Sequence, residues 1–524
     1  MTGPHSDTPS PLPSPSSLTR RVAAGTGWVI AWRVATRNIG LISTLVLVRL
    51  LAPSDFGLVA LATSLASAID ALSGIGVHDA LIRERAPTKQ MYDSAFTMNL
   101  IRGFATAFAL AVAAWPIAEF FAEPRLLPVV LALAGGMAIG TFENIGTVDF
   151  RREMAFQKEF RLQIGSRLFG TAITLGLAFV WQSHWALVAG ILSGRTARVV
   201  QSYALSAYRA RLDLSAWRSL IGFSFWSWAQ TIVGQVRARS DSIIVGRMLG
   251  AAPVAAFSVG QELGELPITE LVAPLHRALF SGFALLQQTG ESPALLYRRV
   301  VEVGFVLLLP AGIGISMVAD PLIRLVLDSR WLGVTPVVQI IAAASTVSIF
   351  STVADAMFSA AGRLRMTFVL MTVVAVLRVP MLVVLVWLYG ITGAALAYAL
   401  ASLMDQGLYL WRALPSLQIR VLDLLSGIWR PIAACIVMVG GLQAAGLAWT
   451  EARDAHPLGL LQDLAERSGL GALLFAASLA AIWLASGRPD GAERNLMDLL
   501  RVGGIQFRKL AVACSWRSRQ RSLG

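Results

Sequence analysis

The sequence predicts an all-α polytopic membrane protein with about fourteen transmembrane helices. Three observations support this fold class. Of its 524 residues, 56% are hydrophobic and only 14% are charged, whereas about a quarter of a soluble protein is charged. Many apolar runs reach the length of about 18 residues that a helix needs to cross a bilayer. Short basic segments separate these runs, as loops at a membrane surface do.

The apolar runs place the spans in order along the chain. We expect them at 22–50, 55–78, 92–121, 126–148, 162–181, 184–207, 220–249, 253–281, 299–319, 335–360, 366–388, 391–412, 428–449 and 470–486. With the N-terminus inside, the inner loops hold most of the loop arginines and lysines, and the outer loops hold few. This alternation predicts that both termini are cytoplasmic. It also explains the net charge of +13 without a nucleic-acid partner.

Both ends of the chain are polar. Residues 1–21 are rich in proline and serine and lack the basic start and apolar core of a signal peptide, which predicts a disordered cytoplasmic tail. Residues 487–524 are basic and are predicted to lie at the inner face as a second cytoplasmic tail, attracted to anionic lipid headgroups.

An internal repeat divides the region between the tails. The segment R-M-L-G-A-A-P from Arg247 aligns with R-L-L-A-P-S-D from Arg49, and P-V-V at Pro336 aligns with P-V-V at Pro128. Because each copy has six spans, both enter the membrane in the same direction and form a parallel repeat, with a substrate site expected between them. The predicted order is an N-terminal six-helix bundle (22–207), a cytoplasmic linker (208–219), a C-terminal six-helix bundle (220–412) and two additional helices (413–486).

Charged residues inside the spans are the predicted site. A charge at a helix centre costs about 2.5–3.5 kcal/mol on insertion scales, so these side chains should face a bundle interior or a watery cavity. In the first bundle Asp70 and Glu143 can neutralise at most two arginines, which leaves a cavity suited to an anion. Guanidinium groups bind phosphate oxygens in a bidentate way. The arginines predicted to line this cavity are Arg33, Arg37, Arg102, Arg167, Arg195, Arg198, Arg237 and Arg239.

One pair in the seventh span has two interpretations. Arg237 and Asp241 are four residues apart, so they are spaced to pair along one helix face. Such a pair could be purely structural, or it could belong to the site.

The sequence does not predict a metal site, a cofactor or an enzyme. The five histidines have no ligand spacing, and the two cysteines form no framework. Phosphate-binding loops and nucleophile elbows are absent from the sequence.

Several motifs carry a resemblance to a known family. They are W-x-x-x-W-R (Trp28 to Arg33), V-R-L-L-A-P-S-D-F-G-L-V-A-L-A (from Val48), S-D-S-I-I-V-G-R-M-L-G (from Ser240) and R-R-E-M-A-F-Q-K (from Arg151). In this order they resemble the Wzx-type lipid-linked oligosaccharide flippases, the polysaccharide transporters of the MATE-like superfamily. The resemblance covers roughly residues 22–415.

The resemblance implies a fold and a substrate. It implies two six-helix bundles in a V shape around a cationic cavity, and transport of undecaprenyl-diphosphate-linked oligosaccharide across the bacterial inner membrane for exopolysaccharide, capsule or O-antigen synthesis. Coupling to a cation gradient would use Asp70, Asp241 or Glu262. The partners implied are the lipid-linked substrate, membrane lipid, and the polysaccharide polymerase with its chain-length machinery.

Three alternatives stay open at this point. A multidrug exporter of the same superfamily handles organic cations, which a cavity rich in arginine would repel. A lipid II flippase is the nearest rival in substrate. A membrane enzyme such as a polymerase or ligase would need a large outer loop with catalytic groups, and the predicted outer loops are short.

Overall fold

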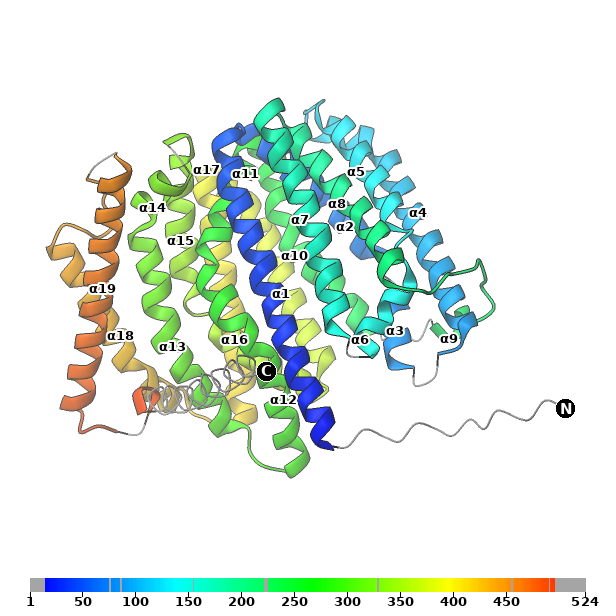
Figure 1. Cartoon of the computed structure of the whole chain (residues 1–524). Helices are drawn as coiled ribbons and strands as arrows, with labels where there is room; N and C mark the ends of the chain where they lie inside the picture. The colour runs from blue at the N-terminus through cyan, green and yellow to red at the C-terminus, as the bar shows by residue number, and fades with distance from the viewer. Residues whose placement is uncertain are drawn as a thin grey trace, which may run out of the picture. The chain divides into compact units, whose positions relative to one another are not determined.

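The computed structural model describes residues 15–74, 77–84, 87–153, 155–220, 225–327, 329–453, 456–489 and 491–494. Within these ranges the chain is helical and contains no strand. It forms two compact units, Met1–Trp228 and Ala229–Gly524. Most of the two predicted tails lies outside the described residues, and the predicted domain boundaries stay predictions. The predicted fold class, an all-α polytopic protein, is confirmed (Figure 1).

Unit 1 consists of long helices joined by short turns. Its elements are α1 (Pro15–Leu50), α2 (Pro53–Leu72), α3 (Val77–Arg83), α4 (Lys89–Phe120), α5 (Leu126–Gly140), η1 (Ile145–Thr147), α6 (Val148–Arg152), α7 (Phe156–Trp181), α8 (His184–Leu205) and α9 (Trp217–Leu220). The helix α1 begins at Pro15, inside the range 1–21 that the sequence predicts as a tail. Proline at the first helical position has a backbone angle already suited to a helix, so Pro15 can begin one.

Local chemistry sets the helix ends in unit 1. Pro53 begins α2, and Asp55 in the first turn interacts favourably with the helix dipole. Thr88 caps α4 by accepting a hydrogen bond from the Met91 amide at 3.4 Å. Between α7 and α8, Gln182 adopts the left-handed conformation that ends a helix.

The α7–α8 pair packs with the backbones close together. A Cβ on Gly170 would lie 2.9 Å from the Gly190 carbonyl oxygen and 3.1 Å from the Gly194 Cα. Only residues without a side chain permit this approach, which is how helices associate in lipid, where burial of apolar surface gives no net drive.

Unit 2 contains the second set of long helices. Its elements are α10 (Phe225–Leu249), which begins at the boundary, α11 (Ala251–Gly264), η2 (Ile268–Val272), α12 (Ala273–Thr289), α13 (Ala294–Met317), α14 (Ala319–Val326), η3 (Ser329–Val334), α15 (Thr335–Ser345), α16 (Ile349–Ala360), α17 (Leu364–Leu417), α18 (Val421–Ala444) and α19 (Pro457–Ala485).

Two predicted spans, 366–388 and 391–412, lie within α17. Gly390 has φ 59° and ψ −136° inside this stretch, a backbone conformation open mainly to glycine. The Arg378 guanidinium lies 5.5 Å from the centre of the Tyr398 ring, whereas a straight helix would separate these residues by about 30 Å. The chain therefore folds back at Gly390, and α17 comprises two helices.

The predicted repeat has a structural counterpart in its fourth span. In unit 1, Leu126–Gly140 and Ile145–Arg152 are bent by 72°, and in unit 2, Arg330–Ser345 and Ile349–Ala360 are bent by 51°. The motif that aligns Pro128 with Pro336 lies in the first limb of each bent pair. Within the described residues, seven helices are long and apolar enough to cross a membrane, or up to nine if each bent pair is one span. The count of fourteen stays a prediction.

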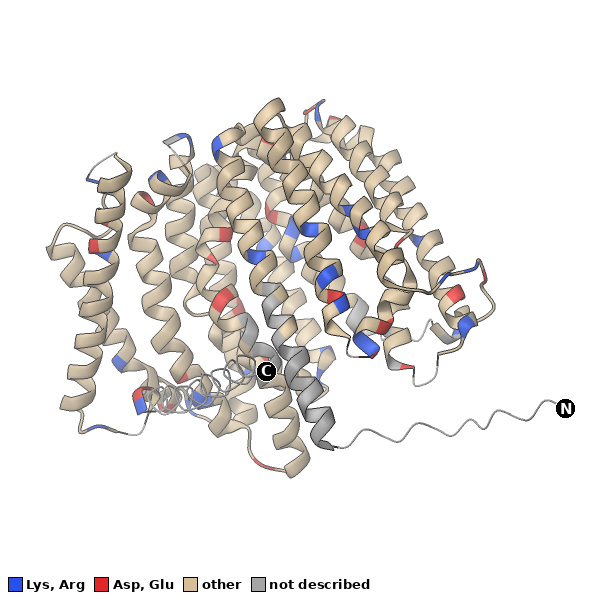
Figure 2. Cartoon of the chain, in the orientation of Figure 1, with Lys and Arg blue, Asp and Glu red and all other residues tan. Residues whose placement is uncertain are grey.

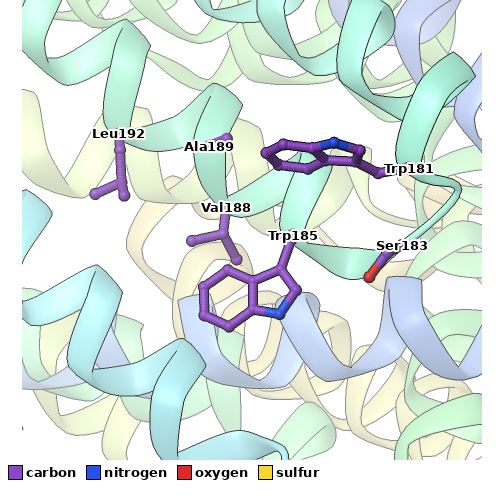
Figure 3. A pocket seen from close by; sticks show the side chains of 6 residues that line it. All are labelled: Trp181, Ser183, Trp185, Val188, Ala189 and Leu192. Carbon is purple, nitrogen blue, oxygen red and sulfur yellow. The ribbon is translucent and has the colours of Figure 1, made fainter.

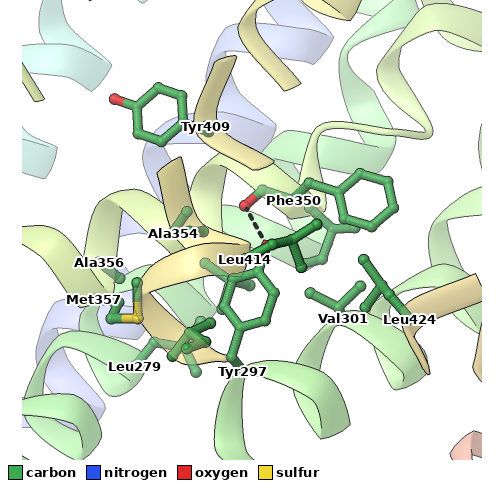
Figure 4. Packing of buried hydrophobic residues seen from close by; sticks show 14 of the residues in the cluster. Leu279, Tyr297, Val301, Phe350, Ala354, Ala356, Met357, Tyr409, Leu414 and Leu424 are labelled. Atoms are coloured by element: carbon green, nitrogen blue, oxygen red, sulfur yellow. Dashed lines mark hydrogen bonds between the residues drawn. The ribbon is translucent and has the colours of Figure 1, made fainter. Parts of the chain in front are cut away.

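A hydrophobic cluster fills the interior of unit 2 (Figure 4). It joins α12, α13, α16, α17 and α18 through buried side chains such as Val301, Phe358 and Leu414. The Tyr297 hydroxyl is buried among them and donates to the Phe350 carbonyl oxygen at 3.5 Å. The cluster holds the second limb of the bent pair against the helices that carry the charged residues.

The two additional helices belong to unit 2 and are fastened at both ends. At one end, Ala452 in the α18–α19 loop donates its amide to Asp320 of α14 at 2.7 Å. At the other end, Arg430 of α18 forms a buried ion pair with Glu493 at 2.8 Å. Glu493 lies in the first part of the predicted basic tail, so that part is packed against α18.

Candidate functional site

Charged side chains occur along the middle stretches of helices as well as at their ends (Figure 2). Because an unsolvated charge is costly inside a membrane, each of these groups needs a partner or a polar cavity. The partners differ between the two units.

In unit 1, Arg102 of α4 bridges to the end of α2. Its Nη1 lies 3.2 Å from Asp70 Oδ1 and donates to Ser73 Oγ at 3.1 Å, while Nη2 donates to Asn99 Oδ1 at 3.1 Å. The side chains stay partly open, with 24% of Arg102 and 55% of Asp70 exposed. This arginine is neutralised by a carboxylate that is itself more than half exposed.

A second arginine pair lies on α8. Arg198 donates to Glu143 at 2.8 Å and to Gln163 of α7 at 2.9 Å. Arg195, one turn earlier, runs past Gly136 of α5, where an added Cβ would lie 3.5 Å from its Nη1. Arg195 makes no hydrogen bond or ion pair with any residue that the structure describes.

The remaining predicted arginines of unit 1 lie on α1 and α7. Arg37 is half-buried. Arg167 is exposed, and its Nη2 would lie 3.2 Å from a Cβ added to Gly40 of α1. Within the described part of the chain, Arg167 has neither a hydrogen bond nor an ion pair. The side chain of Arg33 lies outside the described residues.

Among the charged residues discussed above, the predicted spans of unit 1 therefore hold more arginines than carboxylates. Asp70 and Glu143 each neutralise one arginine, as their number in the sequence predicted. Arg167 and Arg195 keep their donors available, among the residues described. A guanidinium without a carboxylate partner suits an anionic ligand, and its fork of donors fits a phosphate group.

In unit 2, Arg237 and Asp241 are bound to α17 instead of to each other. Arg237 forms a bidentate pair with Asp405, with Nη1–Oδ1 3.1 Å and Nη2–Oδ2 3.3 Å. Asp241 is buried and pairs with Arg378. The predicted pairing along one helix face is thus wrong in its partners, because the fold-back at Gly390 brings two α17 side chains of opposite charge against α10.

Sequence reasoning did not include some members of this network. The ring of Tyr398 packs against the Arg378 guanidinium. Glu265, at the end of α11, accepts a hydrogen bond from Gln261 at 2.8 Å. The π-helical turn η2 that follows soon after is a signal of functional sites that the sequence alone did not reveal.

Other predicted residues of unit 2 have different surroundings. The buried Nε of Arg239 has no hydrogen-bond acceptor among the described residues. Glu262 is exposed on α11. The coupling role predicted for Asp70, Asp241 and Glu262 stays a prediction. No group of three metal-ligating side chains occurs in the part of the chain that the structure describes.

Two cavities open on unit 1. A groove of about 650 Å³ between α2 and α4 includes Arg102, Ser73 and Thr106 among otherwise apolar residues. A second, of about 450 Å³, lies at the α7–α8 turn, and its lining includes Trp181, Trp185, Val188 and Leu192 (Figure 3). Paired tryptophans at a helix end are typical of the membrane–water interface.

Comparison with known proteins supports the fold and a broad function. The model of a family described as "Polysaccharide biosynthesis protein" matches residues 46–336. The chain is 24% identical over 331 residues to the succinoglycan biosynthesis transport protein ExoT of Rhizobium meliloti (strain 1021), covering 63% of this chain and 67% of that protein. It is 20% identical over 393 residues to the lipopolysaccharide biosynthesis protein WzxC of Escherichia coli (strain K12), covering 74% and 80%.

Solved structures share the fold. The lipid II flippase MurJ in an inward closed conformation superposes with a TM-score of 0.68 at 12% identity, covering 88% of this chain and all of that one. An inward-facing multidrug resistance MATE transporter of the MOP superfamily superposes with a TM-score of 0.57 at 16% identity, covering 74% and 98%. At these identities the likeness indicates a common architecture and nothing about the ligand.

Proposed function

The chain belongs to the polysaccharide biosynthesis protein family, and from that premise we propose that it is a flippase for lipid-linked oligosaccharides. It moves undecaprenyl-diphosphate-linked repeat units across the cytoplasmic membrane for exopolysaccharide, capsule or O-antigen synthesis. The curated relatives, which serve succinoglycan and lipopolysaccharide biosynthesis, support this substrate class.

The observation that carries the proposal is the cation surplus of unit 1. Polyprenyl-diphosphate glycans differ in their sugars, but all of them carry two charged phosphoryl groups. Arg195 and Arg167 hold donors that no described carboxylate uses, and charge-assisted bonds to phosphate are about twice as strong as neutral ones. A cationic drug would be repelled by the same surplus, which weighs against multidrug export.

Two arginines of unit 2 are paired with carboxylates, so this unit has a different role in the proposal. Its two best-defined intramembrane arginines are already bound to Asp405 and Asp241, so this unit contributes structure and, through its acidic side chains, any coupling to a cation. Arg237 is accordingly a weaker candidate for the diphosphate than Arg195.

We place the protein in the bacterial inner membrane with both termini in the cytoplasm. The arginine-rich inner loops support this orientation. A polysaccharide polymerase and its chain-length machinery act on the product, which makes them the expected partners.

The test replaces Arg195 and Arg167 singly by Gln in a strain that lacks the chromosomal gene. Surface polysaccharide should fall by about tenfold or more for Arg195→Gln, since one charge-assisted phosphate contact is lost. The lipid-linked repeat unit should accumulate on the inner leaflet. Arg161→Gln, at an exposed position on the same α7 helix as Arg167, is the matched control and should export normally.

Protein abundance in the membrane must be equal for all variants. Normal polymer output by both Arg195→Gln and Arg167→Gln would refute the role of the cations. A deletion strain that keeps its polysaccharide and becomes sensitive to cationic drugs would favour the exporter instead.

A further inference from the structure

The groove between α2 and α4 combines one charged side chain with an apolar wall. The charged side chain is Arg102, and Ser73 and Thr106 are polar residues of the same lining. The rest of its lining is apolar and comes from both helices, for example Ile69 and Ile101. A groove with one charged side chain and a mostly apolar lining fits an amphiphile.

The groove borders a surface of α4 that suits contact with lipid chains. Phe108 is 71% exposed and Val112 is 61% exposed. On the same helix, Phe108 lies between the groove residues Thr106 and Ala109, and Val112 follows them. The Asp70 carboxylate is 55% exposed at this edge. A charge in this position is costly against hydrocarbon unless water or a ligand solvates it.

We propose that this groove is a lateral access site, in which Arg102 binds the diphosphate of the lipid-linked substrate and the apolar wall binds the adjoining polyprenyl chain. The inference rests on the proposed function and adds where the substrate first contacts the protein. In this proposal Arg102 binds the diphosphate first, at the surface of unit 1. Arg195 on α8 binds it afterwards.

The occupant is a diphosphate lipid instead of a bulk phospholipid because Arg102 already has a counterion. The Asp70 carboxylate lies 3.2 Å from its guanidinium. A phosphodiester carries the same single charge as Asp70 and gains little by replacing it. A diphosphate brings a second phosphoryl group to the remaining donors and therefore displaces the carboxylate.

Asp70 can turn to a second arginine when it is displaced. Arg195 forms no hydrogen bond with any described residue. The helices α2 and α8 are neighbours in unit 1. Asp70 thus acts as a movable counterion, which balances the charge of one arginine while the diphosphate binds the other.

The first experiment maps the lipid by photocross-linking. A diazirine amino acid replaces Ala105, which lines the groove, or Phe108, which is exposed on the same helix outside it. The full-length protein is reconstituted in phosphatidylcholine nanodiscs with undecaprenyl diphosphate. We expect the diphosphate lipid to cross-link at Ala105 at least five times more than at Phe108, where phosphatidylcholine should dominate.

Substitutions then identify the groups responsible. Arg102→Gln should lower the Ala105 cross-link about tenfold, as expected for a lost charge-assisted bond, and Asp70→Asn should raise it because the competing carboxylate is gone. Arg161→Gln should leave it unchanged. An undiminished cross-link in Arg102→Gln, or equal displacement by phosphatidylglycerol, would overturn the assignment.

A second substitution keeps Arg102 and fills the volume of the groove. Ala105→Trp fills the groove, and Phe108→Trp places the same ring outside it as a control. We expect polysaccharide export to fall at least fivefold only for Ala105→Trp. If both export normally while Arg195→Gln does not, the access site is wrong and the proposed function stands.

Discussion

The buried ion pair of α19 offers a sharp prediction about what holds the additional helices in place. Arg467 is 1% exposed and Asp463 3% exposed. Nε of Arg467 donates to Asp463 at 3.0 Å, and its Nη1 and Nη2 donate to the carbonyl oxygens of Thr450 and Glu451 at 2.9 and 3.0 Å. One side chain thus fastens α19 to the loop that precedes it.

The substitution Arg467→Met keeps most of the side-chain volume and removes all these donors. It leaves a buried carboxylate without its counterion and two carbonyl groups without a donor. Breaking a buried pair in this way costs about 3–5 kcal/mol. With about 2 °C lost per kcal/mol in a large domain, the melting temperature in detergent should fall by about 6–10 °C.

The chain contains a matched control on the same helix. Glu466 pairs with Arg453 at 3.2 Å, but the two side chains are 54% and 53% exposed. Because solvent screens such a pair, Glu466→Gln should cost less than about 1 kcal/mol. Melting is followed by size-exclusion chromatography after heating. Equal shifts for Arg467→Met and Glu466→Gln would refute the reasoning, since burial would then have no influence on the pair.

Three further outcomes are expected. Gly170→Ala should destabilise the protein by about 1–3 kcal/mol through overpacking against the Gly190 carbonyl, measured by thermal melting, whereas Gly176→Ala, with no atom within 4 Å, should be neutral. Gly390→Ala should cost about 1 kcal/mol or more because its φ of 59° is strained for alanine; an unchanged melting temperature would contradict the tight turn. A reporter that fluoresces only in the cytoplasm should be bright when fused to the C-terminus, and a dark fusion would reverse the proposed orientation.

The positions of the helices follow from the sequence because the bilayer imposes a length and an apolar composition on each span. Each predicted span overlaps one helix or a short series of consecutive helices. The repeat follows from the sequence as well, because Pro128 and Pro336 stand in the same local sequence and lie in the two bent pairs. The shortage of carboxylates near the arginines of unit 1 also follows from the amino-acid sequence, since it requires only a count of charged residues in each span.

The partners of the charged residues could not be predicted in the same way. Asp405 and Arg378 are far from Arg237 and Asp241 along the chain, and only the reversal at Gly390 brings them to α10. The groove that contains Arg102 depends likewise on how α2 packs beside α4. Composition and periodicity act on one helix at a time, so the sequence determined which charges lie within the membrane. The pairing of helices acts over long separations, so only the tertiary structure decided which of those charges are neutralised and which can still bind a ligand.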